Sequence, residues 1–208
     1  MPDIAAGDVL GSCVFNTLIL AFLDAIYKPM PISAKAHHGH ILSAGFGILL
    51  LSIIVIGLFL GNRITPLGWI GPYSLIVPVI YFAAMRLLFV YEKRRIAGFV
   101  KEMVVSISAV KMGAIDLAVG NLFGSNIFNM FILAIDDMFF VKGPILSFVN
   151  ANHIISALSA ILMTAIAIIG LTYRSEKKKL LLAWDSIGIL LVFIANLIKR
   201  IPRSSASG

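Results

Sequence analysis

The sequence contains a single cysteine, Cys13, and little charge for its length. One cysteine excludes an internal disulfide and a thiolate-rich metal site. Charged residues make up 13% of the 208 residues, roughly half of the ~25% that is typical of a soluble domain. Hydrophobic residues make up 60%, and the mean hydropathy is +1.00. These values are typical of a helical membrane protein.

Motifs for covalent chemistry are also missing. No nucleotide-binding loop, redox thiol pair or zinc-protease motif is present, and no nucleophile–base pair is apparent. We therefore expect neither an enzyme nor a resident cofactor. No cleavable signal peptide is visible, because Pro2 and Asp3 follow Met1 directly.

The net charge of +7 comes from short basic clusters. Lys93–Arg95, Lys177–Lys179 and Lys199–Arg200 each flank an apolar run. This placement is typical of topology signals beside membrane spans, and it favours a lipid bilayer over a nucleic acid as the partner.

Six apolar runs have about the ~20 residues that a helix needs to cross the hydrocarbon core. Runs 41–60, 64–85 and 154–173 carry no charge, and run 180–198 carries only Asp185. Runs 4–23 and 112–135 are interrupted by polar residues. Asp185 suits either a proton relay or a hydrogen bond between helices, and both interpretations stay open.

A shorter run, 96–110, contains Lys101 and Glu102. It is too short to cross comfortably, so we predict a partial or re-entrant helix over 96–111. The predicted organisation is a first repeat over 1–95, this short helix, and a second repeat over 112–203.

The two halves match each other at a fixed shift of 113 residues. Residues 3–16 read DIAAGDVLGSCVFN and residues 116–129 read DLAVGNLFGSNIFN. From residue 3 to residue 58, 23 of 56 positions are identical to the residue 113 further on. Shared hydrophobicity alone would not align Gly, Asp, Asn, Pro and His, so the halves arose by duplication.

With three spans per half and no crossing at 96–110, the second half enters the membrane from the opposite side. The sequence therefore predicts an all-α, polytopic integral membrane protein with inverted internal repeats, an architecture common in transporters. Loop charge agrees, because loops 28–39, 86–111 and 174–179 are rich in Lys and Arg and then share one side, which the positive-inside rule makes cytoplasmic.

Polar residues repeat on one face of the two interrupted spans. Ser12 and Asn16 are four residues apart and share a helix face, and Ser125 and Asn129 repeat this pattern. Their neutral oxygens suit hard cations such as Na⁺ and Ca²⁺. Four neutral ligands carry too little charge for Ca²⁺, and Glu102 is the natural anionic ligand.

The same residues permit a structural interpretation, since Ser and Asn also join transmembrane helices by hydrogen bonds. Two copies in one register favour a site. Gly7, Gly11, Gly120 and Gly124 predict close helix packing under either interpretation. The histidines His37, His38 and His40 are more typical of a surface loop than of a metal site.

The motif Gly120-Asn-Leu-Phe-Gly-Ser-Asn-Ile-Phe-Asn129 resembles the second α-repeat of the sodium/calcium exchanger (Ca²⁺:cation antiporter) superfamily, and residues 7–16 resemble the first. The resemblance covers residues 3–199 with gaps. It implies paired inverted repeats that bind Ca²⁺ and Na⁺ at mid-membrane. Carried over, Ser12, Asn16, Ser125 and Asn129 are ligands, and Glu102, 23 residues before Ser125, takes the place of the family's acidic ligand.

The chain departs from the family pattern in two places. Gly98-Phe-Val-Lys-Glu102 replaces the family's Thr-Ser-Leu-Pro-Glu, so the Ser/Thr ligands and the proline are missing. The acidic helix of the first repeat would precede Met1. We therefore expect a truncated member with six spans where the family has ten.

The resulting hypothesis is a cation antiporter of the plasma (inner) membrane that exchanges calcium for sodium or protons by alternating access. Such a chain, with one of two acidic helices, is expected to bind Ca²⁺ poorly. The alternative is a non-transporting membrane scaffold or assembly subunit. Assembly as a homo-oligomer stays open.

Overall fold

The computed structural model describes residues 1–27, 30–63, 65–102, 108–174 and 182–200, without the side chains of 62, 94–102, 108–113 and 200. Lys177–Lys179, Arg203 and the side chain of Glu102 therefore lie outside the described part. The helices and 3₁₀ turns, in chain order, are α1 (Pro2–Ile26), α2 (Ile32–Lys35), α3 (Gly39–Leu60), η1 (Gly61–Arg63), α4 (Tyr73–Glu102), α5 (Ser108–Phe139), η2 (Ile145–Phe148), α6 (His153–Tyr173) and α7 (Trp184–Arg200).

Five helices in the described residues are long and apolar enough to cross a membrane. They are α1, α3, α6, residues Tyr73–Lys93 of α4 and residues Ala114–Phe139 of α5. The sixth predicted span, 180–198, corresponds to α7, which has 17 residues and a length of roughly 25 Å. That is less than the ~30 Å of a hydrocarbon core, although α7 packs alongside α6 and α1.

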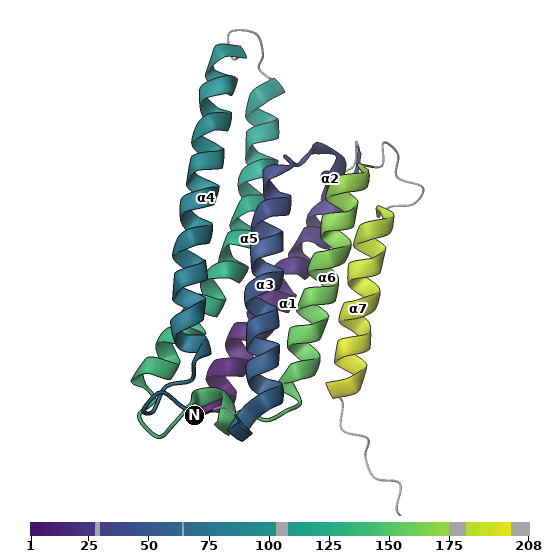
Figure 1. Cartoon of the computed structure of the whole chain (residues 1–208). Helices are drawn as coiled ribbons and strands as arrows, with labels where there is room; N and C mark the ends of the chain where they lie inside the picture. Colours follow the sequence, from purple (N-terminus) through teal and green to yellow (C-terminus); the bar gives the residue numbers. More distant parts are fainter. Residues whose placement is uncertain (28–29, 64, 103–107, 175–181, 201–208) are drawn as a thin grey trace, which may run out of the picture.

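The two halves run in opposite directions, as the sequence predicts. In Figure 1, α1 rises from the end that holds the N-terminus, α3 descends and α4 rises, whereas α5 descends, α6 rises and α7 descends. The shift of 113 pairs α1 with α5 and α3 with α6, so each matched pair is antiparallel. The repeats are therefore inverted.

The fourth helix begins later than predicted and continues further. Residues 65–72 form a turn instead of membrane helix, because Pro66 and Pro72 remove backbone donors and Gly68 adopts a positive φ of 70°. Helix α4 then continues to Glu102, and α5 begins at Ser108. In the described residues, 96–102 are thus the last turns of α4 and 108–111 the first turn of α5, where the sequence predicted a separate short helix.

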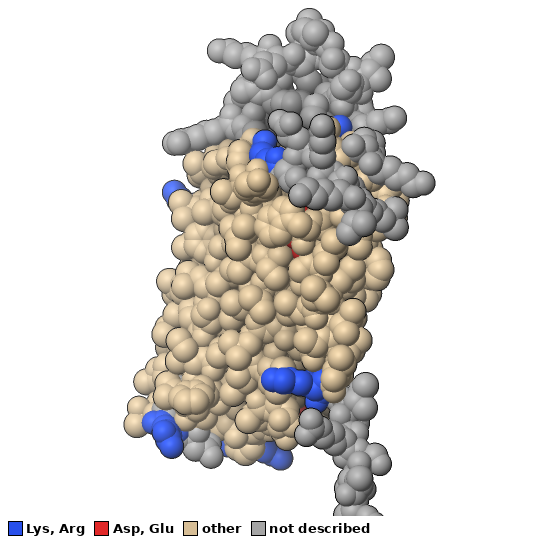
Figure 2. Space-filling model, turned by 90° about the vertical axis from the view of Figure 1, so that its right-hand side faces the viewer, with Lys and Arg blue, Asp and Glu red and all other residues tan. Residues whose placement is uncertain are grey.

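The α4–α5 hairpin extends beyond the other helices at one end of the molecule (Figure 1). Thirty residues give α4 a length of roughly 45 Å, more than a hydrocarbon core of ~30 Å. The space-filling view shows Lys and Arg near the two ends of the visible face, with a broad band between them that lacks both (Figure 2). Charged ends with an uncharged band between them are typical of a protein that spans a bilayer.

Helix α1 lies behind α3 and α6 in the view of Figure 1 and packs against α5, α6 and α7. The core holds large apolar side chains from every repeat helix, including Leu10, Leu51, Ile127 and Met163, all fully buried. The closest packing between the two halves joins α3 with α6 and α1 with α5. The crossing of α1 and α5 positions the repeated polar motif.

Candidate cation site at the crossing of the repeats

The two GS-x-x-FN motifs meet where α1 crosses α5. The Asn16 Nδ2 atom donates a hydrogen bond of 3.0 Å to Asn126 Oδ1, and Asn129 Nδ2 lies 3.6 Å from Cys13 Sγ. Asn126 occupies the position of Cys13 in the second repeat, and Asn129 that of Asn16. The two contacts are therefore the same contact made twice, and a pseudo-twofold axis passes between α1 and α5.

These contacts use the amide N–H groups of the two asparagines and leave their oxygens available. Within the described residues, neither Asn16 Oδ1 nor Asn129 Oδ1 accepts a hydrogen bond. Both side chains are half-buried. Two carbonyl oxygens related by the pseudo-twofold axis thus remain as ligands of the kind that hard cations prefer.

The serines of the motifs lie toward the open side of the same helices. Ser12 is half-buried and Ser125 is exposed. Each helix also carries an exposed stripe of apolar residues at equivalent repeat positions. These residues are Ile4 and Phe15 on α1 and Leu117 and Phe128 on α5. The structure thus places Asn16 and Asn129 at one crossing, and Ser12 and Ser125 lie about one turn before them on the same helices.

Glu102 is not brought to this crossing. It is the last residue of α4, at the end of the hairpin that projects beyond the bundle (Figure 1). Ser125 lies 17 residues along α5 from Ser108, a distance of roughly 26 Å at 1.5 Å per residue. The predicted acidic ligand therefore lies far from the four neutral ligands.

A cavity with a mostly apolar lining lies between α3, α4 and α5 on the hairpin side of the crossing. Its volume is about 810 Å³, and its polar lining comes from His40, Ser43, Glu92, Asp116 and Asn121. Asn121 is four residues before Ser125, about one helical turn. The cavity therefore reaches to within about one turn of the motif at Asn121, whereas its carboxylate Asp116 lies nine residues before Ser125.

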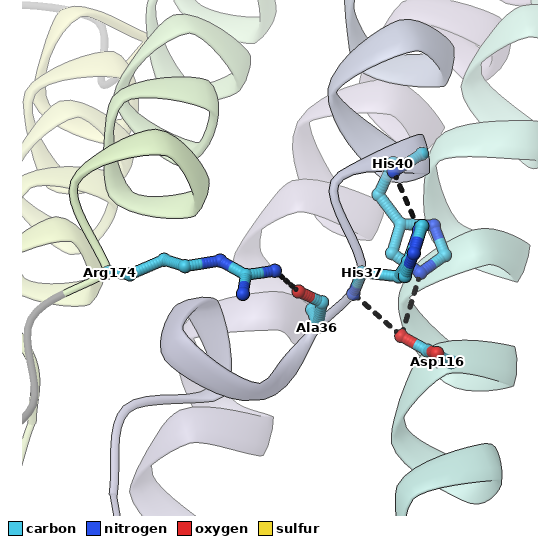
Figure 3. Close-up of polar contacts among 6 residues, drawn as sticks. Ala36, His37, His40, Asp116 and Arg174 are labelled. Atoms are coloured by element: carbon cyan, nitrogen blue, oxygen red, sulfur yellow. Dashed lines mark hydrogen bonds and ion pairs between the residues drawn. The ribbon is translucent and has the colours of Figure 1, made fainter. Parts of the chain in front are cut away.

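Two reciprocal carboxylate contacts join the repeats near this cavity and at the opposite end. Asp116 of α5 accepts a hydrogen bond of 2.8 Å from the backbone N–H of His37, and its Oδ1 lies 3.1 Å from His40 Nε2. Figure 3 shows the His37 backbone nitrogen and the His40 ring directed toward Asp116, with Arg174, just after α6, reaching across to the Ala36 carbonyl oxygen at 2.7 Å. We call the contact of Asp116 with His37 and His40 the first clasp.

The second clasp repeats this contact at the other end of the molecule. Asp3 accepts a hydrogen bond of 2.7 Å from the Asn150 backbone N–H, and its Oδ1 lies 3.4 Å from His153 Nε2. Asp3, Asn150 and His153 are the positions of Asp116, His37 and His40 shifted by 113. The histidines predicted to belong to a surface loop thus include one, His40, that holds the two repeats together.

The repeated glycines divide into two kinds. A Cβ at Gly7 would lie 3.1 Å from a ring carbon of His153, and one at Gly120 would lie 3.3 Å from His40. The predicted close packing is therefore present at these two positions, where the clasp histidines approach. A Cβ at Gly11 or Gly124 would meet nothing within 4 Å, so the prediction is wrong there.

Asn126 and Cys13, which join the two helices at the crossing, were not predicted from the sequence. Asn126 is 2% exposed and Cys13 is fully buried. Each residue directly follows the Ser of its motif. When the two repeats are aligned, this is the one position between Gly and Phe where one repeat has a polar residue and the other does not. That mismatch was the available signal, because a buried Asn needs a partner from another helix.

Together, the fold and the crossing define a multi-spanning membrane protein made of two inverted repeats. A family model described as sodium/calcium exchanger protein matches residues 96–201, slightly more than half of the chain. The chain belongs to this family. Neither the curated proteins nor the solved structures contain a match to it. The family match lies on the second repeat, and the reciprocal contacts relate the first repeat to it.

Proposed function

We propose that this protein is a cation antiporter that moves Ca²⁺ against Na⁺ or protons by alternating access. The observation that supports this most is the pair of unengaged oxygens of Asn16 and Asn129, at the point where the two inverted repeats cross. Inverted repeats place substrate sites near the middle of the bilayer and exchange access by rocking about that point.

The proposed ligands are Ser12, Asn16, Ser125 and Asn129. They are neutral, so they suit Na⁺ better than Ca²⁺, which usually takes six to eight oxygens including carboxylates. The cavity on the hairpin side of the crossing is lined in part by Glu92 and Asp116, and we propose that these carboxylates lie along the approach to the site. Glu102 remains the proposed acidic ligand of the family pattern, and in the structure its backbone lies at the hairpin end.

Ion flux in proteoliposomes tests the proposal. Purified protein should take up Ca²⁺ when an outward Na⁺ or H⁺ gradient is imposed. Asn129→Ala and Asn16→Ala should each lower the rate about tenfold or more, since loss of even an outer-shell partner costs 10–100-fold in many metal sites. Glu102→Gln should lower Ca²⁺ flux if that acid reaches the site during the cycle.

A matched control separates ion binding from helix packing. Asn196 of α7 donates a hydrogen bond of 2.7 Å to Ser159 Oγ of α6, away from the crossing. Asn196→Ala therefore removes a hydrogen bond between helices without touching the proposed ligands, and it should retain flux. Equal losses in Asn196→Ala and Asn129→Ala would contradict a ligand role for Asn129.

The second candidate is a non-transporting membrane scaffold or assembly subunit. It is favoured by the inward hydrogen bonds of Asn16 and Asn129 and by the uncovered stripe of Ile4, Phe15 and Phe128. Flux equal to that of empty vesicles under every gradient would support this candidate and end the transport proposal for the chain. We propose the plasma (inner) membrane as the location, and a homo-oligomer remains compatible with the uncovered stripe.

A further inference from the structure

Asp137 forms a fully satisfied buried corner at the C-terminal end of α5. Its side chain is 0% exposed. It accepts hydrogen bonds from the backbone N–H groups of Gly71 and Ile145 and from the hydroxyls of Tyr73 and Ser74. Four donors around one carboxylate offset the cost of burying its charge.

Asp24 is the repeat partner of Asp137, 113 residues earlier, and it forms the equivalent corner at the end of α1. It is 2% exposed and accepts hydrogen bonds from the backbone N–H groups of Ile32 at 2.9 Å and Ala183 at 2.8 Å. Ile32 is the repeat partner of Ile145. Ala183 corresponds to Gly71 at a shift of 112, one residue less than in the earlier helices.

The two corners differ in the residue that the last helix of each repeat contributes. At the shift of 112, Ser186 replaces Ser74 and Asp185 replaces Tyr73. Tyr73 donates its hydroxyl proton to Asp137 over 2.6 Å. An aspartate at that position is an acceptor when ionised, so the Asp24 corner holds a second acid where the sister corner holds a donor.

Asp185 is deeply enclosed and partly unsatisfied. It is 5% exposed, and its Oδ1 has no hydrogen-bond partner among the described residues. It lies against the backbone of Gly170 in α6, where any Cβ would overlap its carboxylate. A cavity of about 10 Å³ beside it is lined by Asp24, Ser33 and Ser186, close to the minimum for a single water-sized occupant.

The charged groups around Asp185 come from few elements. Helix α1 contributes a second carboxylate, Asp24, and α2 contributes the Ser33 hydroxyl, which hydrogen-bonds to Asp185. The backbone N–H groups of Asp185 and Ser186, in the first turn of α7, also hydrogen-bond to this carboxylate. Helix α6 contributes the non-titratable Ala167 and Leu171 to the cavity lining.

Nearby cationic groups among the described residues bond elsewhere. Arg174 donates to the carbonyl oxygen of Ala36, and Lys35 donates to the hydroxyl of Tyr27 at 2.9 Å. Residues 175–181 lie outside the described part. The described surroundings of Asp185 therefore hold one further acid and no basic side chain directed at it.

We propose that Asp185 is a proton-binding site, which takes up one proton on its partly unpartnered carboxylate beside Asp24. A buried carboxylate with one oxygen left without a donor is destabilised unless it is neutralised. The step is a reversible protonation that forms one O–H bond, with the proton coming from water. It does not depend on the proposed transport.

A bare metal cation fits the corner less well than a proton. Both oxygens of Asp24 already accept backbone N–H groups. The remaining oxygens are those of Asp185, Ser33 and Ser186, around a space for one small occupant. Hard cations such as Ca²⁺ need six to eight oxygens, whereas a proton needs one.

Infrared difference spectroscopy of the purified full chain in detergent tests this site. The C=O stretching band of a protonated carboxyl group should persist at pH ~6, well above the ~3.9 at which exposed aspartates titrate, and should shift when the protein carries isotopically labelled aspartate. Asp185→Asn should remove the band. Asp8→Asn is the matched control, since Asp8 is exposed and its repeat partner is already Asn121.

Each outcome decides the assignment. Loss of the band in Asp185→Asn with retention in Asp8→Asn supports it. Absence of the band in the wild-type protein at every pH overturns it, even if the variants fail to fold. A band that NaCl removes at fixed pH, while choline chloride does not, also overturns it, because the corner then takes Na⁺ in place of the proton.

Discussion

At the scale of single residues, Asn126 connects the two motifs more extensively than any predicted ligand does. Its Oδ1 accepts the Asn16 amide, its Nδ2 lies 3.4 Å from Thr17 Oγ1, and its backbone oxygen lies 3.9 Å from Cys13 Sγ. Cys13, at the equivalent place, makes a single weaker contact with Asn129. The two sides of the crossing therefore have the same geometry, but the hydrogen bonds at Asn126 are stronger than the contact at Cys13.

Asn126→Ala should lower the thermal stability of the purified protein. The change leaves Asn16 Nδ2 without its partner, and hydrogen bonds between membrane helices contribute about 0.6–2 kcal/mol. Thermal unfolding in detergent measures the effect. Asn121→Ala, on the exposed face one turn away, is the control and should leave the unfolding midpoint nearly unchanged. Equal shifts in both variants would contradict the contact.

The glycines give a second prediction at this scale. Gly120→Ala should destabilise the fold by about 1–3 kcal/mol, because its Cβ would press on the His40 ring of the first clasp. Gly124→Ala, one turn further along α5, should be neutral or mildly stabilising, since alanine is the better helix former and its Cβ meets open space. Denaturation of both variants in one detergent compares them.

The predicted ligands came from the sequence because repetition marked them: a Ser-Asn pair that occurs twice in one register is unlike ordinary apolar helix. Cys13 and Asn126 did not come from it, since repeat comparison emphasises identity and these two positions differ. Asp3 and His40 were visible as conserved repeat positions, but their pairing across the repeats follows only from the antiparallel arrangement of the halves. Sequence spacing within one helix cannot give that arrangement.

At the scale of elements, each clasp attaches a motif helix, at the Asp that begins its repeated motif, to the start of the next helix of the other repeat. The first clasp is better shielded than the second, because the side chains of His40 and Asp116 are 11% and 19% exposed, whereas those of His153 and Asp3 are 18% and 57% exposed. Exposure weakens such contacts, and exposed ion pairs contribute only about 0–1 kcal/mol.

Asp116→Ala should therefore cost more stability than Asp3→Ala. The first change removes the partner of the buried His40 and of the His37 backbone N–H, a loss of about 1–3 kcal/mol. The second removes contacts that water can replace. Chemical denaturation of the two variants measures the difference. A larger loss in Asp3→Ala would show that the second clasp is the stronger one.

The predicted bounds of a helix agree with the structure where the apolar run is followed by a charged residue or a turn. Helices α3 and α6 match the runs 41–60 and 154–173 within two residues at each end. Helix α4 differs because hydropathy does not register Pro66, Gly68 and Pro72, which delay its start to Tyr73. The continuation of α4 to Glu102 was also not predicted. A helix that carries Lys101 and Glu102 can extend outside a membrane, because its charged residues then stay in water and have no desolvation cost.

At the scale of the whole molecule, the inverted arrangement fixes which loops share a side. Arg63 and Lys142 lie at the end that holds the N-terminus, and the projecting hairpin that carries Lys93 lies at the other (Figure 1). The loops with more Lys and Arg share the hairpin side. The positive-inside rule makes that side cytoplasmic.

Cysteine labelling of intact cells tests this topology. Arg63→Cys and Lys142→Cys should react with a membrane-impermeant maleimide from outside, and Lys93→Cys should react only after permeabilisation. The native Cys13 is fully buried and should not contribute. All three sites are exposed, so access through the membrane decides the result. Labelling of all three from outside would contradict the inverted topology.

The two buried acid corners also set an order of assembly during synthesis. When Asp137 is made, Gly71, Tyr73 and Ser74 already exist, and Ile145 follows eight residues later, so that corner can close at once. Asp24 must wait for Ala183, 159 residues downstream. Chains emerge N-terminus first, so one end of the molecule matures early, and the other stays open until the last helix is inserted.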